Sequence, residues 1–360
     1  MTTETSNEAV AQQYQEELDR TIKRYTRAMG YAENMPEVPV GQSPKEVVWT
    51  RNKAKLYHYL PSTGKKYDVP LLIIYALINK PYVMDLRPGS SLIEYLVGQG
   101  YEIYLLDWGT PGPEDRHLKL DDYILDYIPR AVKHTLQHSG AKEISLLGYC
   151  IGAALTVSFA ALHTEMPIKN IVLMAAPLDF SEKGLLRGWL DPEYYNVDQL
   201  VNAYGLIPAE MVDFGSKMLK PMNNFVLTYT NFWDKLWDDR AVESWLSMNK
   251  WVNDGVPFAG EAFRQWVKEC YLGNKLTTNQ LVLRGRTVDL SQIKASLLNI
   301  IADKDHIALP SQSKPIMNLV SSEDKEQIIL PGGHVGLVVG RGATKNLWPA
   351  LNKWLSTRSK

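Results

Sequence analysis

The chain has 360 residues, a formal net charge of −1, 45% hydrophobic residues and 22% charged residues. This size and balance are typical of a globular protein with a large core, and a net charge near zero gives no electrostatic reason to expect nucleic acid as a partner. We expect no signal peptide, because the chain starts with polar and acidic residues, and no transmembrane segment, because the longest apolar stretch, residues 69–78, is too short. Two cysteines, Cys150 and Cys270, predict no disulfide framework and a cytoplasmic location.

Residues 1–40 are predicted to be an N-terminal helical segment, with one amphipathic helix over residues 7–30. Apolar residues recur there every three or four positions among charged residues, as expected for one face of a helix. We expect this face to pack on its own domain; the alternative is a docking surface for a partner. The residues of the face are Val10, Tyr14, Leu18, Ile22, Tyr25 and Met29.

From residue 46 onward, strand patterns alternate with helix patterns. Residues 46–51 and 55–60 are predicted to form a hairpin around Asn52 and Lys53. The later alternation predicts an α/β protein with a mainly parallel sheet and helices on both faces. The further predicted strands are 70–75, 102–106, 144–147, 171–174, 297–302 and 327–330, and the predicted helices are 90–97, 122–138, 151–163 and 344–355.

The alternation stops near Leu178 and resumes at Leu297. Residues 178–290 contain six of the seven phenylalanines and six of the ten tryptophans. We expect this segment to be a large cap, or lid, inserted into a core made of residues 41–177 and 291–360. The alternative is an ordinary helical subdomain whose rings are core; most rings should be core, with about one in five lining a tunnel or a subunit interface.

The most informative motif is Gly148-Tyr149-Cys150-Ile151-Gly152, which follows an apolar strand and precedes a helix. G-x-S-x-G at such a turn is the nucleophile elbow of the α/β-hydrolase fold, and here cysteine replaces serine. Glycines on both sides keep Cβ atoms away from the sharp turn. The motif predicts an α/β-hydrolase fold with Cys150 as a covalent nucleophile, whereas Cys270, inside the insertion, is expected to be an inert packed thiol.

A cysteine nucleophile needs a base and an acid, which follow it in that fold in the order nucleophile, acid, histidine. His334 lies between glycine-rich residues directly after the last predicted strand and is the expected base. Asp305 follows the strand 297–302 and is the expected acid, with Asp303 as the alternative. His306, next to Asp305, is a candidate for orienting substrate or for supporting its loop.

The expected oxyanion hole consists of the backbone N–H of Ile151 and a second N–H from the loop 76–79, that of Ile78. His306 and Asn79 are the candidate substrate-binding residues. A thiol nucleophile favours acyl transfer from a thioester, because exchange between two thioesters is close to energy-neutral. We expect no metal and no cofactor.

Five stretches together resemble one enzyme family over residues 40–355, the catalytic subunits of polyhydroxyalkanoate synthases, and within it the short two-subunit classes III and IV, with class IV favoured. The matching stretches are 79–86, 107–109, 148–152, 305–307 and 333–334. The resemblance implies polymerisation of (R)-3-hydroxyacyl-CoA, with 3-hydroxybutyryl-CoA as the expected substrate, and release of CoA. It also implies Cys150, Asp305 and His334 as the catalytic triad, and often a second role for the acid in activating the chain hydroxyl.

The partners implied by the resemblance are a small helper subunit (PhaR-like) or a second synthase subunit, a homodimer of this chain, and the growing polyester. The expected location is the cytoplasm, at the surface of polyhydroxyalkanoate granules. The alternative function is that of a cysteine hydrolase of the dienelactone-hydrolase type. Such enzymes are much shorter and lack a large cap, so the aromatic insertion argues against them.

Overall fold

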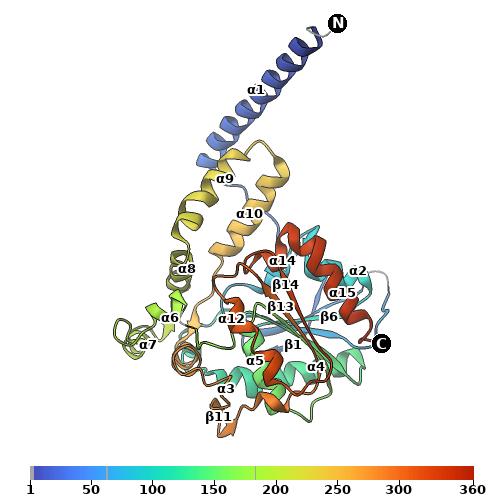
Figure 1. Cartoon of the computed structure of the whole chain (residues 1–360), viewed down its shortest axis with the longest axis vertical. Coiled ribbons are helices and arrows are strands. Elements are labelled where there is room, and N and C mark those ends of the chain that lie inside the picture. The colour runs from blue at the N-terminus through green and yellow to red at the C-terminus, as the bar shows by residue number, and fades with distance from the viewer. Residues whose placement is uncertain (1–3, 62–63, 183) are drawn as a thin grey trace.

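The computed structural model describes residues 4–61, 64–182 and 184–360, and its centre is an eight-stranded sheet formed by these residues (Figure 1). The order is β1-β2-β6-β3-β7-β8-β13-β14; β1, β2 and β6 are antiparallel neighbours, and the strands from β6 onward are parallel. The predicted hairpin and the mainly parallel sheet are therefore confirmed. The strands are β1 (Glu46–Arg51), β2 (Ala54–Tyr59), β3 (Leu71–Ile74), β6 (Ile103–Asp107), β7 (Ile144–Tyr149), β8 (Ile168–Met174), β13 (Ser296–Ala302) and β14 (Lys325–Leu330).

Helices cover both faces of the sheet, as the alternating pattern predicts (Figure 1). α2 (Leu92–Gln99) and α15 (Trp348–Ser356) contact each other on one face, while α4 (Ile128–Ser139) and α5 (Ile151–Leu162) lie on the other. Every residue of β3 and β7 is buried, because central parallel strands are covered on both sides. Cys150 directly follows β7, so these buried strands hold the elbow in a fixed position.

Two predicted helices begin elsewhere or are irregular. α2 begins at Leu92 rather than at residue 90, because the Ser91 hydroxyl accepts a hydrogen bond from the Glu94 N–H at 2.9 Å and caps the helix. The predicted helix 122–138 begins at Leu120 (α3, Leu120–Asp122) and widens into a π-helical turn at Tyr123–Tyr127 before α4. The wide turn directly precedes Ile128-Pro129, where the proline has no N–H to donate and its ring would clash with the carbonyl group four residues earlier.

A largely helical insertion, residues 178–290, separates β8 from β13. Its helices α8, α9 and α10 stand above the carboxyl edge of the parallel strands, between the sheet and the N-terminal helix (Figure 1). The boundaries of the insertion as a separate cap domain stay a prediction. Its α-helices are α6 (Leu185–Trp189), α7 (Val197–Tyr204), α8 (Ala209–Met218), α9 (Thr228–Asp234), α10 (Asp239–Asn253) and α11 (Gly260–Gln265), with π-helical turns at Met222–Leu227 and Trp266–Leu272.

The N-terminal helix α1 (Glu4–Glu33) projects away from the body of the protein (Figure 1). Within the described residues, its C-terminal half is anchored on the insertion. The Tyr25 ring contacts Trp233, and Ala28 and Tyr31 pack on a small cluster of Leu236, Val242 and Leu246. Arg27 donates a hydrogen bond of 2.7 Å to the Leu236 carbonyl.

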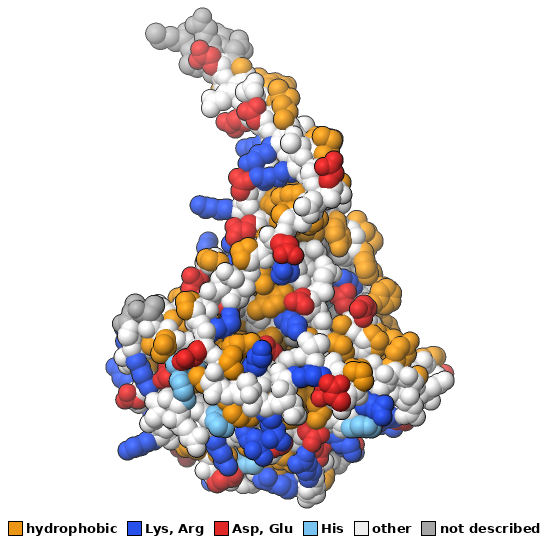
Figure 2. Space-filling model, turned by 180° about the vertical axis from the view of Figure 1, so that it is seen from behind, with side chains coloured by type: hydrophobic (Ala, Val, Ile, Leu, Met, Phe, Trp, Pro, Cys, Tyr) orange, Lys and Arg blue, Asp and Glu red, His pale blue; other side chains and the backbone are white. Residues whose placement is uncertain are grey.

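The expectation that the domain covers the apolar face of α1 is wrong. Tyr14 is 76% exposed and Met29 67% exposed, and hydrophobic side chains run along the projecting helix in Figure 2. The physical reason has two parts. The N-terminal half of the helix projects away from the body, and the C-terminal half packs through Arg27, Ala28 and Tyr31, which lie on a different side of the helix from the apolar face. Residues 1–3 of the predicted N-terminal segment lie outside the described residues. No helix within the described ranges is both long enough and apolar enough to span a membrane.

Candidate active site

Cys150 occupies a strained turn between β7 and α5. Its backbone has φ of 55° and ψ of −129°, a conformation rare for a residue with a side chain. A Cβ on Gly152 would lie 2.2 Å from the Ile74 carbonyl oxygen, and one on Gly148 would lie 2.5 Å from the Ala153 Cα. Only glycine fits at either position, so the G-x-C-x-G pattern is a steric requirement of the elbow that presents the cysteine.

His334 and Asp305 form a close pair beside the elbow. The two side chains are joined by a hydrogen bond of 2.7 Å between His334 Nδ1 and Asp305 Oδ2. The other oxygen of Asp305 accepts the N–H groups of Ile307 at 2.9 Å and Ala308 at 3.0 Å. This anchoring holds the buried carboxylate in place, and the carboxylate in turn fixes the orientation and tautomer of the imidazole.

Asp303, the alternative acid, has a different role in the structure. Its carboxylate accepts the Gly332 N–H at 2.9 Å, and the Lys304 N–H donates to the Gly332 carbonyl at the same distance. Asp303 therefore braces the glycine-rich loop that carries His334, and Asp305 is the carboxylate that contacts the imidazole.

The electrostatic environment favours a protonated His334. Burial opposes a positive charge on the ring, but the charges of Cys150 and Asp305 and the hydrogen bonds to both side chains outweigh it. Together they raise the pKa of His334 to about 10. A cationic imidazole next to a sulfur atom is the arrangement that activates a cysteine nucleophile.

We expect the pKa of His334 to fall when Cys150 is replaced by alanine, because the sulfur is one of the groups that raise it. The measurement is a histidine-selective NMR titration of the wild-type protein and of Cys150→Ala. An unchanged His334 pKa in the variant would show that the two side chains are not coupled.

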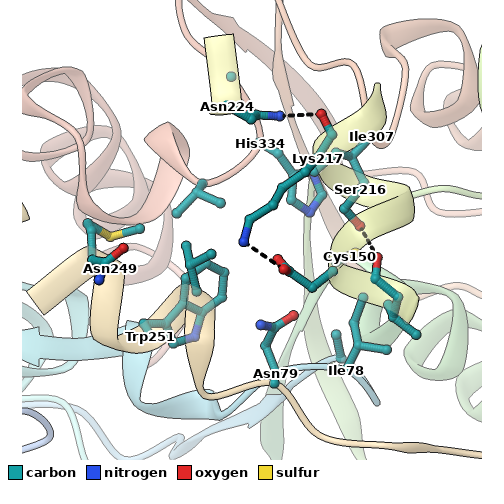
Figure 3. A pocket seen from close by; sticks show the side chains of 18 of the residues that line it. Ile78, Asn79, Cys150, Ser216, Lys217, Asn224, Asn249, Trp251, Ile307 and His334 are labelled. Carbon is teal, nitrogen blue, oxygen red and sulfur yellow. Dashed lines mark hydrogen bonds and ion pairs between the residues drawn. The ribbon is translucent and has the colours of Figure 1, made fainter. Parts of the chain in front are cut away.

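The expected oxyanion-hole groups flank the cysteine. Ile151 is the first residue of α5, and Ile78 lies in the loop after β3, lining the same cavity as Cys150 (Figure 3). Within the described residues, neither N–H donates to a carbonyl outside the helices and strands, as an oxyanion hole requires. The loop after β3 is held at both ends, by Trp108 Nε1 on the Tyr75 carbonyl at 2.9 Å and Trp251 Nε1 on the Lys80 carbonyl at 2.8 Å.

A cavity of about 420 Å³ lies between the carboxyl edge of the sheet and the insertion. Cys150, His334 and Asn79, one of the two candidate substrate-binding residues, line it (Figure 3). The other candidate, His306, also lines this cavity. Burial and the nearby Lys220 ammonium group lower the pKa of His306, so its ring is neutral at pH 7. Cys270 is buried outside the lining, and burial raises the pKa of its thiol, in agreement with an inert packed residue.

Sequence reasoning missed the polar groups on the insertion side of the cavity. Lys217 Nζ donates to Asp213 Oδ2 at 2.6 Å, and Asn224 Nδ2 donates to the Lys217 carbonyl at 2.9 Å (Figure 3). An Asp and a Lys four residues apart are normally a solvent-exposed helix pair, so the sequence carried no signal that this pair faces a cavity. Of the aromatic residues in the insertion, Tyr229, Trp245 and Trp251 line the cavity.

Two family models match the chain. Residues 69–340 match the alpha/beta hydrolase fold, and residues 33–96 match the poly-beta-hydroxybutyrate polymerase (PhaC) N-terminus. Among solved structures, a putative lipase from Sulfolobus solfataricus covers 87% of this chain and 93% of its own at a TM-score of 0.56 and 16% identity. The predicted α/β-hydrolase fold is therefore confirmed.

Curated relatives extend over most of the chain. The poly(3-hydroxyalkanoate) polymerase subunit PhaC of Haloferax mediterranei is 41% identical over 96% of this chain and 70% of that protein. The protein of the same name from Allochromatium vinosum is 37% identical over 95% of this chain and 98% of its own length.

Proposed function

The chain belongs to the family of poly(3-hydroxyalkanoate) polymerases, and we propose that it polymerises (R)-3-hydroxyacyl-CoA to polyester and releases CoA, with 3-hydroxybutyryl-CoA as its substrate. The observation that carries the mechanism is the pair of Cys150 and His334 on the floor of one cavity, with buried Asp305 hydrogen-bonded to His334. We assign these three residues as the catalytic triad of a short, two-subunit synthase.

The first half-reaction loads the enzyme. The Cys150 sulfur attacks the thioester carbonyl; a bond from Sγ to the acyl carbon forms, and the bond to the CoA sulfur breaks. His334 gives its proton to the departing CoA thiolate. The N–H groups of Ile151 and Ile78 stabilise the negative oxygen that develops in between. A thioester replaces a thioester, so the acyl group is stored without a deep energy minimum.

The second half-reaction extends the chain. A hydroxyl group of an acyl chain attacks the acyl-Cys150 carbonyl, His334 accepts the hydroxyl proton, and the bond from the acyl carbon to Sγ breaks. Asp305 is ill placed to be this base, because one oxygen binds His334, the other binds two backbone N–H groups, and its side chain is fully buried. We therefore assign proton transfer in both half-reactions to His334, with Asp305 acting through it.

The test of the activity is CoA release from 3-hydroxybutyryl-CoA, measured together with the mass of insoluble polyester, with and without a candidate small subunit. Release of CoA with polyester supports the proposal. Release of CoA with free 3-hydroxybutyrate, or opening of lactones instead, would point to the hydrolase alternative, which the long insertion and the curated relatives disfavour.

The names of the relatives describe a subunit, and we propose that α1 is the site where a small helper subunit (PhaR-like) binds. Its exposed apolar face is unpartnered in this chain over most of the helix, and an amphipathic helix of this length can pair with a partner helix.

The polyester itself has an apolar surface, and exposed Phe214, Met222 and Phe225 of the insertion offer it a contact at granules in the cytoplasm. A homodimer of the chain is a further proposal.

Replacing Leu18 and Ile22 with glutamate is expected to weaken helper binding and to lower helper-dependent activity, with little change in melting temperature. Both side chains are more than half exposed, so the domain itself loses no packing. Pull-down of the helper and a thermal melt of the variant are the measurements. Gln12→Glu, outside the apolar face of the same helix, is the matched control; undiminished pull-down by the double variant would contradict the assignment.

A further inference from the structure

A second cluster of chemically active side chains lies at the β1–β2 edge of the sheet, outside the cavity with Cys150. Glu46 on β1 and His58 on β2 face each other across the hairpin, and His138 reaches them from the last turn of α4. Glu46 Oε1 is 3.0 Å from His58 Nδ1 and 4.0 Å from His138 Nε2, and the three ligand atoms lie within 4.8 Å of one another.

The carboxylate of Glu102, next to the cluster, determines which nitrogen atoms of the two histidines carry protons. Glu102 is buried and paired with Lys65 Nζ at 2.9 Å, so it accepts hydrogen bonds and donates none. Its Oε1 therefore receives the Nε2–H of His58 at 3.1 Å and the hydroxyl proton of Tyr104 at 2.8 Å.

This arrangement determines the tautomer of each histidine. With its Nε2 protonated toward Glu102, a neutral His58 has a bare Nδ1 facing Glu46. The Tyr104 hydroxyl donates its only proton to Glu102, so its oxygen can act only as an acceptor toward His138. His138 Nδ1, 2.8 Å from that oxygen, must therefore carry the proton and donate it. The Nε2 of a neutral His138 is then bare as well, and it also faces Glu46.

When both histidines are neutral, three lone-pair donors thus converge with no proton between them. A bare imidazole nitrogen 3.0 Å from a carboxylate oxygen is repulsive unless a positive charge lies between the two. We propose that Glu46, His58 and His138 bind a divalent transition-metal ion, with Zn²⁺ as the best fit and water in a fourth position.

The chemistry of the donors agrees with zinc. Two histidines and one carboxylate with an open position are a recurrent Zn²⁺ ligand set, in which neighbouring ligand atoms lie about 3.3 Å apart at normal bond lengths. Reaching that spacing from 4.0 Å needs a shift of His138 or Glu46, and both side chains are partly exposed. The Glu102 contact behind His58 and the Tyr104 contact behind His138 are the outer hydrogen bonds that metal-binding histidines usually make.

A solvent path to the cluster exists. Glu46 and His58 line a surface hollow that also includes Lys45 and Asp85, whose charged groups lie 3.9 Å apart. A bound ion would tie α4 to the β1–β2 hairpin. Because it would bind only the folded chain, it would raise the melting temperature.

The competing occupant is a single proton on His58 Nδ1, which would make the ring a cation paired with both Glu46 and Glu102 and leave no room for a metal. Zinc binding to the full chain decides between the two. The experiment uses Cys150→Ala protein, so that the thiol near His334 does not add a background site, and measures Zn²⁺ by equilibrium dialysis and Co²⁺ by its visible absorption.

We expect one Zn²⁺ per chain and a rise in melting temperature on its addition. His138→Ala, at an exposed position, should weaken binding more than tenfold, while His134→Ala, one turn earlier on α4, should leave it unchanged. Tyr104→Phe keeps every ligand but removes the oxygen that fixes His138, and should weaken binding about tenfold to a hundredfold. No stoichiometric binding, or equal binding by His138→Ala, would overturn the proposal.

Discussion

Replacing Cys150 with alanine is expected to lower CoA release by a factor on the order of 10⁴ or more, since it removes the nucleophile to which the acyl group is transferred. The fold should survive, because alanine is smaller than cysteine and keeps the Cβ that the elbow accommodates. The measurement is chromatographic quantification of CoA released from 3-hydroxybutyryl-CoA, together with circular dichroism and a thermal melt of the variant.

Cys270→Ala is the matched control, because it removes the other thiol of the chain. That side chain is buried away from the cavity, so its loss should change the activation barrier by about 1 kcal/mol or less, which is within tenfold in rate. Residual CoA release by Cys150→Ala within tenfold of wild type would sink the assignment of the nucleophile.

The second large effect concerns the two residues behind the cysteine. His334→Gln is expected to lower the acylation rate on the order of 10⁴-fold or more. The rate reduction caused by Asp305→Asn should be smaller than this by a factor of roughly ten to a hundred. The histidine exchanges protons with the reacting groups, whereas the carboxylate acts through the histidine. Single-turnover CoA release with labelled substrate measures acylation, and the length distribution of the products measures elongation.

The same experiment tests whether Asp305 has a separate role in elongation. Since both of its oxygens are hydrogen-bonded and its side chain is buried, Asp305→Asn should slow acylation and elongation by similar factors. Normal acylation followed by accumulation of short chains would instead show that the carboxylate activates the hydroxyl group. Asp303→Asn is the control, as it perturbs the loop of His334 without touching the ring.

The hydrophobic periodicity of the sequence predicted most of the sheet and its flanking helices correctly. The elbow could also be predicted, because its requirement is local. A residue with positive φ lies between two positions where a Cβ would clash, so only glycine fits at either position. His334 and Asp305 were placed by the chain order typical of the fold, which made two distant residues predictable. Helix starts were less accurate, because single side-chain contacts such as the cap by Ser91, and the proline at residue 129, decide them.

Other properties depend on which surfaces meet in three dimensions. The periodicity of α1 gives an apolar face but does not say what covers it, and only the structure places that face in solvent. Likewise, an Asp and a Lys one turn apart have the same spacing on a surface helix as at a cavity wall, and the fold puts Lys217 at the wall.

The clearest contrast is between the two proposed sites of the molecule. The elbow that presents Cys150, the proposed nucleophile, was determined by the sequence itself, because a strained turn restricts which residues can surround it. The group of Glu46, His58 and His138 matches no metal-binding spacing along the chain, and it exists only because strand pairing and helix packing bring a hairpin and the end of α4 together. Tertiary structure decides such a site, since the direction of each lone pair depends on hydrogen bonds between residues far apart in sequence.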